Sequence, residues 1–109
     1  MKITPFTVSV AEAAIADLNL RLGLTRWPDE VSEGTWEYGM PRKVLRDVVE
    51  YWRDRFDWRA AERRLNGLPQ FTAEIDGRIV HYVHVNGVDR ESAPLVLTHG
   101  WPGSFVEMY

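Results

Sequence analysis

The residues whose types and spacing could do chemistry form one continuous string, His99-Gly100-Trp101-Pro102-Gly103-Ser104. Gly100 allows a close backbone approach or an unusual dihedral, and Pro102 fixes its own φ and restricts Trp101 to extended geometry. These restraints can hold the backbone N–H of Trp101 pointing outward. A fixed backbone donor stabilises negative charge that develops only during a reaction. The string therefore predicts a turn that supplies one donor of an oxyanion hole.

Other residues allow chemical roles that the sequence favours less. We expect His99 to brace the turn by hydrogen bonding rather than to transfer protons. Ser104 could be a nucleophile, but capping of a following helix explains it without a base that the sequence does not supply. His81 and His84 are three residues apart on an expected strand, so they point to opposite faces and we expect no shared metal ion.

An outward-facing donor needs a strand behind it. The run Pro94-Leu95-Val96-Leu97-Thr98 is short, continuous and apolar, as expected for a strand buried on both faces of a sheet. Before it, Phe71–Ile75 and Ile79–Val85 alternate with a period of two, and Asp76-Gly77 between them predicts a tight hairpin. We expect the Trp101 amide to lie outside any hydrogen-bond ladder and Leu95–Thr98 to lie inside a sheet.

The N-terminal part of the chain predicts helices and one long loop. Ser9-Val10-Ala11-Glu12 has the pattern of a capping box that opens an amphipathic helix over residues 10–22, and Gly23 is a plausible stop. From Leu24 to Met40 no helical or strand period is visible. This segment predicts an aromatic-rich loop, in which we expect Trp27 and Trp36 to be buried anchors.

Two further helices follow the loop. Pro41 suits the first position of a helix that runs to about Phe56, with an apolar stripe that we expect to pack within the same protein. Asp57 can cap a short third helix from Trp58 to about Leu65.

The composition limits the classes of function. The chain has 109 residues, of which 45% are hydrophobic and 27% charged, which is typical of one small globular domain. A net charge of −3 argues against a nucleic-acid partner. The sequence has no cysteine, which excludes disulfides and thiolate metal sites and fits a cytoplasmic location, and no apolar run is long enough to span a membrane.

The turn and the segments before it resemble a known family. His-Gly-X-Pro after an apolar strand is similar to the oxyanion motif of α/β-hydrolases that use an Asp nucleophile, including epoxide hydrolases and haloalkane dehalogenases. The leader, with Trp27-Pro28, the Trp36–Tyr38 region and Tyr51-Trp52, resembles the epoxide hydrolase N-terminal domain, which dehalogenases lack. The string from His99 to Ser104, followed by Glu107, is similar to the microsomal and juvenile-hormone branch.

This resemblance implies a fold class and a division of the chain. The fold is α/β, with an N-terminal helical leader followed by a β-hairpin and the first buried strand of an incomplete α/β-hydrolase sheet. Residues 1–69 would be the leader, and residues 70–109 would be the first strands and the oxyanion turn of the hydrolase core.

The resemblance also implies a mechanism for the complete enzyme. An Asp carboxylate attacks a small-molecule epoxide, and a His-activated water cleaves the resulting ester, without a cofactor or a metal. Trp101 would donate its backbone N–H, and the neighbouring residues that shape the turn would be His99, Gly100, Pro102 and Gly103.

The sequence contains neither a Gly-x-Asp-x-Gly nor a Gly-x-Ser-x-Gly elbow. We therefore expect a chain truncated after the oxyanion motif, inactive alone, whose partner is the remainder of the hydrolase domain. We expect no nucleic-acid or membrane partner, and the sequence does not indicate an oligomeric state. Two other functions stay open, a freestanding non-catalytic binding or remnant protein and the N-terminal part of another α/β-hydrolase such as an esterase.

Overall fold

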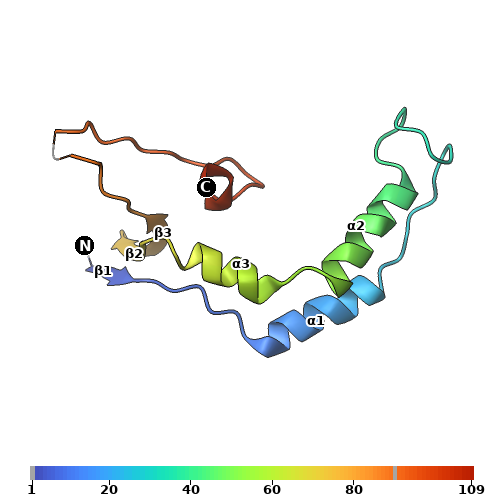
Figure 1. The fold of residues 1–109 in the computed structure, drawn as a ribbon, viewed down its shortest axis with the longest axis horizontal. Coiled ribbons are helices and arrows are strands. Elements are labelled where there is room, and N and C mark those ends of the chain that lie inside the picture. The colour runs from blue at the N-terminus through green and yellow to red at the C-terminus, as the bar shows by residue number, and fades with distance from the viewer. Residues whose placement is uncertain (1, 90) are drawn as a thin grey trace. The chain divides into compact units, whose positions relative to one another are not determined.

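The computed structural model describes residues 2–89 and 91–109 and divides the chain into two compact units. One unit contains Val10–Trp58, and the other combines Met1–Ser9 with Arg59–Tyr109. Figure 1 shows the elements of both units in chain order. The first unit is helical, whereas the second contains a three-stranded antiparallel sheet and the segment with the candidate turn.

The helical unit contains α1, Glu12–Gly23, and α2, Arg42–Asp54, which contact each other. The N-cap of α1 is Ala11, whose side chain has no capping hydrogen bond, so the predicted start with Ser9 as the cap is wrong by two positions. Extended backbone at Ala11 (φ −61°, ψ 143°) and its carbonyl, which accepts from the N–H of Ala14 and Ile15, open the helix instead.

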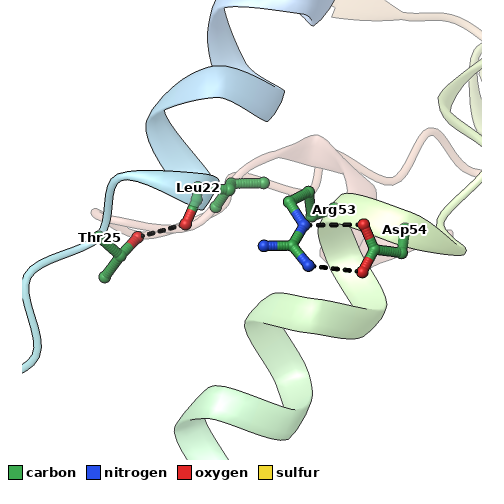
Figure 2. Close-up of polar contacts among 4 residues, drawn as sticks. All are labelled: Leu22, Thr25, Arg53 and Asp54. Carbon is green, nitrogen blue, oxygen red and sulfur yellow. Dashed lines mark hydrogen bonds and ion pairs between the residues drawn. The ribbon is translucent and has the colours of Figure 1, made fainter.

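Both helices of this unit end on short-range polar contacts (Figure 2). The hydroxyl of Thr25 donates to the carbonyl of Leu22 at 2.8 Å, which satisfies one of the free carbonyls at the end of α1. At the end of α2, the Arg53 guanidinium donates two hydrogen bonds of 2.7 Å to the two carboxylate oxygens of Asp54. This fork holds the pKa of the Asp54 carboxyl below its ordinary value.

The loop between the two helices is irregular, as predicted, and it is fastened to the start of α2. Pro41 is the N-cap rather than the first helical residue. The Glu30 carboxylate accepts a hydrogen bond of 3.0 Å from the N–H of Arg42, one of the amides that the first turn leaves free. Trp27 lies under the guanidinium of Arg46, 5.3 Å from its ring centre.

Trp36, in contrast to Trp27, is 64% exposed, so the predicted buried anchor is wrong at that position. No described residue forms a ring contact or cation–π contact with its indole.

The second unit is organised around β2, Gln70–Ile75, the central strand of the sheet. β1, Lys2–Pro5, pairs with one edge of β2, and β3, Arg78–Val83, pairs with the other, both antiparallel. Ala73, which is 5% exposed, lies in register with Ile3 on β1 and with Val80 on β3. The hairpin is confirmed, whereas the strand at the N-terminus was not predicted.

The hairpin turn consists of Asp76 and Gly77, which have φ values of 50° and 74°. Two successive residues with positive φ are the requirement of a type I′ turn, whose twist matches that of the flanking strands. Asp tolerates this region and Gly adopts it without steric cost. The Asp-Gly pair therefore fixes the register of β2 and β3.

Helix α3, Trp58–Leu65, has the predicted bounds and leads into the sheet through Asn66. The Asn66 side chain accepts from the N–H of Val8 and donates to its carbonyl, each at 2.8 Å. One amide side chain thus imitates a strand partner for Val8 and connects the segment after β1 to the end of α3.

The predicted buried strand at Pro94–Thr98 is not formed, which corrects that part of the expected fold. The segment has no regular secondary structure, and Val96 is 84% exposed. A continuous apolar run becomes a strand only when neighbouring strands satisfy its backbone and cover both faces. The described part of the chain places no such neighbour beside it.

Candidate functional site

The candidate turn is followed by a short 3₁₀ helix, η1, Phe105–Met108, and Ser104 is its N-cap. The Ser104 backbone is extended, and its hydroxyl oxygen accepts from the N–H of Val106 at 3.3 Å, while its carbonyl accepts from Glu107 at 3.1 Å. The capping role expected for Ser104 is confirmed. The helix that it opens is a single 3₁₀ turn, so the turn has a defined exit.

The entrance to the turn carries a contact within the motif itself. A ring nitrogen of His99, Nδ1, lies 3.1 Å from the carbonyl oxygen of Gly100. Because a carbonyl can only accept, Nδ1 must carry the proton in this hydrogen bond. The contact ties the imidazole to the backbone of the next residue, which is the type of contact that a bracing residue makes.

Trp101 stands at the apex of the turn, and its peptide bond with Pro102 is cis. Its side chain is 95% exposed. Within the described part of the chain, no backbone carbonyl or side chain accepts a hydrogen bond from its N–H. The Trp101 amide therefore lies outside any backbone ladder, which meets one of the two expectations for an oxyanion donor, whereas the other, Leu95–Thr98 inside a sheet, is not met.

Gly103 contributes by the absence of a side chain. A Cβ at this position would overlap the carboxylate of Glu107, which folds back from η1 onto the turn. Glycine thus leaves space for an acidic side chain beside the exit from the turn.

Two contacts attach the segment after the turn to the rest of its unit. The ring of Phe105 lies 4.9 Å from the ring of His81 on β3, tilted by 57°. The guanidinium of Arg64 on α3 lies 5.6 Å from the centre of the Tyr109 ring. The turn is consequently followed by a helix with one contact near each end.

The two histidines of the hairpin region have separate roles. His81 packs against aromatic rings of its unit and makes a hydrogen bond of 3.0 Å with Gln70. His84 donates its backbone N–H to the carbonyl of Pro69 at 3.0 Å and so extends the hairpin. The described residues include no group of three or more His, Asp or Glu side chains with the geometry of a metal site.

The sequence did not indicate Gln70, the most buried polar residue of this unit at 3% exposure. It follows Pro69 at the start of a strand, where a polar residue is ordinary. No local pattern in the sequence indicated its burial, because its hydrogen-bond partners, Leu65 and His81, lie in other elements.

The comparisons with known proteins identify the family. Residues 3–108 match the family model described as the epoxide hydrolase N terminus. The chain is 45% identical over 105 residues to a candidate epoxide hydrolase of Stigmatella aurantiaca, covering 96% of this chain and 24% of that protein. It is 37% identical over 112 residues to juvenile hormone epoxide hydrolase 1 of Ctenocephalides felis, covering all of this chain and 24% of that protein.

The solved structures agree with the sequence relatives. The Aspergillus niger epoxide hydrolase superposes with a TM-score of 0.86 at 36% identity, over 98% of this chain and 29% of that one. The predicted α/β class with a helical leader before a hairpin is confirmed by this likeness, and the chain spans about a quarter of the length of its curated relatives. No helix in the described residues has the length and apolar character needed to cross a membrane. Because the match to the family model extends over almost the whole sequence, the chain belongs to the epoxide hydrolase N-terminus family.

Proposed function

We propose that this chain is the N-terminal part of an epoxide hydrolase that converts epoxides to vicinal diols through an Asp-ester intermediate. Its contribution would be the oxyanion turn and a packing leader. The observation that carries the proposal is the backbone N–H of Trp101, which has no acceptor among the described residues and stands at the apex of a turn closed by Ser104.

The chemistry assigns this donor to the second half of the reaction. Attack of an Asp carboxylate opens the epoxide and leaves an ester on the enzyme. Attack of water on the ester carbonyl then creates a tetrahedral oxyanion, and a fixed N–H stabilises that charge as it forms. In this proposal Trp101 supplies the N–H, while the residues that shape the turn around it are His99, Gly100, Pro102 and Gly103.

The nucleophile, the base and the groups that protonate the epoxide oxygen would come from the remainder of the hydrolase domain. We accordingly propose that the 109-residue chain alone does not turn over epoxides. We keep the division into a leader, residues 1–69, and the first part of the hydrolase core, residues 70–109, and a cytoplasmic location as parts of the same proposal.

The test uses a chimaera in which this chain replaces the matching segment of the Aspergillus niger enzyme. It compares two substitutions of Trp101 in that chimaera. Trp101→Pro removes the backbone N–H, whereas Trp101→Ala keeps it and removes the indole. Loss of one oxyanion donor costs about 100-fold to 1,000-fold in kcat. We expect Trp101→Pro to slow ester hydrolysis by that factor, with the ester accumulating in single-turnover experiments.

Trp101→Ala is the matched variant, since it changes the same side chain without removing the donor. We expect its rate of ester hydrolysis to stay within roughly tenfold of the parent chimaera, with the larger change in KM because the exposed indole is a candidate substrate contact. Equal losses of ester hydrolysis in the two variants would assign the effect to the indole and refute the oxyanion role. Circular dichroism of both variants shows whether the fold is retained.

A further inference from the structure

A buried amide joins helix α3 to strand β3. Gln70, the first residue of β2, donates from Nε2 to the carbonyl of Leu65 at 2.8 Å, and its Oε1 faces Nε2 of His81 at 3.0 Å. Its backbone carbonyl also accepts from the N–H of Phe6 at 2.8 Å. Both ends of the Gln70 amide are therefore hydrogen-bonded, and Nε2 also lies 3.5 Å from Oδ1 of Asn66.

This arrangement determines which nitrogen of His81 carries a proton. The carbonyl of Leu65 can only accept, so the amide NH₂ of Gln70 must face it. The amide oxygen is then the atom that faces His81, and it too can only accept. The Nε2 atom of His81 must therefore be a donor, and in the neutral ring the proton lies on Nε2.

The same hydrogen bond sets the orientation of the imidazole ring. Phe6 meets that ring edge-on, with centres 4.9 Å apart and planes at 68°, and Phe105 approaches it at 4.9 Å and 57°. Such tilted and edge-on contacts depend on ring orientation. Rotation of the His81 ring would therefore change the surface on which Phe105 rests.

Phe105 follows Ser104 directly, so its seat on His81 lies one residue from the end of the turn. The other end of η1 has its own anchor, since Tyr109 lies under Arg64, and Arg64 is the neighbour of Leu65, the residue that receives the Gln70 amide. The path from α3 through Gln70 and His81 to Phe105 is thus continuous contact by contact.

We propose that His81 is a positioning residue for the turn that presents the Trp101 amide. Gln70 holds its ring in the Nε2–H form, the ring seats Phe105, and Phe105 fixes the exit of the turn. This inference rests on the proposed function of Trp101, because the direction of that amide is the quantity that His81 controls.

The experiment uses the 109-residue chain, labelled with ¹⁵N. Long-range ¹H–¹⁵N correlation of the His81 ring is expected to show the Nε2–H tautomer. Backbone order parameters are expected near about 0.85 at Gly100 and Trp101 in the parent chain. In the variant His81→Phe, which keeps an aromatic ring but has no donor, we expect these values to fall below about 0.6 while cross-strand contacts between β2 and β3 persist.

His81→Phe separates positioning from packing, because a residue that only filled space would be replaced by Phe without effect on the turn. Phe105→Ala is expected to loosen the turn to the same extent, and His84→Ala, on the same hairpin, is the control that leaves the order parameters unchanged. An Nδ1–H tautomer at His81, or an ordered turn in a folded His81→Phe variant, overturns the proposal. If His81→Phe unfolds the hairpin, Phe105→Ala alone decides.

The same variants in the Aspergillus niger chimaera distinguish this inference from the proposed function. We expect His81→Phe to slow ester hydrolysis at least about tenfold with little change in KM. Normal hydrolysis in Trp101→Pro would refute the proposed function but leave the tautomer and the order parameters standing. Slow hydrolysis in Trp101→Pro with normal hydrolysis and a rigid turn in His81→Phe would refute the positioning role alone.

Discussion

Strand β2 and the run Pro94–Thr98 belong to the same unit, but β2 buries a polar side chain whereas the run exposes apolar ones. β2 begins with an amide side chain, Gln70, that is 3% exposed, whereas the apolar run is open to solvent along its length. Both segments are extended in sequence pattern, and only β2 has a strand on each side. The difference shows that partners, rather than hydrophobicity, decide which extended segment becomes a strand.

The reason lies in the backbone. Each residue of a strand carries an N–H and a carbonyl that must be paired if the strand is buried. β1 and β3 supply those partners to β2 on both edges, and the Gln70 side chain is tolerated inside because both its polar atoms are also paired. Leu95 and its neighbours have the apolar side chains for burial but no ladder.

Hydrogen exchange of backbone amides should show this contrast at its largest. In the central strand of an antiparallel sheet successive amides point alternately to the two neighbours, so the amides of Thr72 and Ala73 are both held. We expect them to exchange at least about 100-fold more slowly, relative to intrinsic rates, than the amide of Val96. NMR-detected exchange on the 109-residue chain measures each site.

Protein concentration is the control for this measurement. Exposed apolar runs can pair between molecules, so the exchange is repeated at two concentrations tenfold apart. Protection of Val96 equal to that of Ala73 at both concentrations would show that the run has a partner within the chain, and the contrast between the two segments would fail.

A glycine substitution in the hairpin turn should give a smaller effect. Gly77 has a φ of 74°, a region that L residues enter only with strain, so Gly77→Ala is expected to lower the free energy of unfolding of this unit by about 1 kcal/mol. Gly100→Ala is the matched variant, because the φ of Gly100 lies outside that region and a Cβ there would meet nothing within 4 Å, so the special backbone role predicted for Gly100 is wrong. Urea denaturation followed by the near-ultraviolet signal of the aromatic residues measures both.

The two substitutions test the contrast between β2 and the run Pro94–Thr98, because Gly77 lies in the turn between two paired strands and Gly100 follows the unpaired run. We expect Gly100→Ala to change the free energy of unfolding by less than about 0.5 kcal/mol. If Gly100→Ala lowered the free energy of unfolding as much as Gly77→Ala, the backbone that follows the run would be constrained, which would contradict the lack of pairing in that segment.

Local signals explain what could be predicted from the sequence. The hairpin follows from Asp76-Gly77, the start of α3 at Trp58 from Asp57 before it, and the cap of η1 from Ser104. Each depends on residues within one turn of the chain. The predicted start of α1 was wrong, because the helix begins after Ala11, whose side chain makes no capping hydrogen bond, and not after Ser9.

Features that depend on distant parts of the chain could not be predicted. β1 is four residues long and pairs with a strand about 70 positions further on, and the residues of Lys2–Pro5 do not indicate which strand that is. The burial of Gln70 was not indicated, because its partners, Leu65 and His81, come from a helix and from another strand. The strand expected at Leu95–Thr98 failed because apolar character is local and pairing is not.

The candidate site divides along the same line. The turn from His99 to Ser104 was visible because its residues are consecutive and Pro102 restricts both its own φ and the backbone of Trp101. Its attachment through Phe105 to His81 was not visible, because the two positions are far apart in sequence and His81 alone does not specify a ring partner.

The smallest expected effect concerns the connection between β3 and the apolar run. The hydroxyl of Ser92 donates to the Asp89 carboxylate at 2.9 Å, and the N–H of Glu91 donates to the same oxygen at 3.0 Å. These hydrogen bonds, that of Ser92 above all, hold the pKa of Asp89 below its ordinary value. A carboxyl with a lowered pKa stabilises its turn above the unfolded-state pKa, and that contribution is lost as the pH falls through the folded-state value.

Ser92→Ala removes the hydrogen bond with the largest effect on the Asp89 pKa, so this pKa should rise toward the ordinary range of an Asp. A ¹³C titration of the Asp89 carboxyl group measures it. Ser32→Ala, in the helical unit, is the control and should leave the titration unchanged. If the shift occurs, the connection is an ordered turn that delivers the run to a defined place. The exposure of Leu95 and Val96 would then result from the lack of a paired strand and not from a flexible connection before the run. An unchanged Asp89 pKa in Ser92→Ala would instead indicate that the connection is flexible.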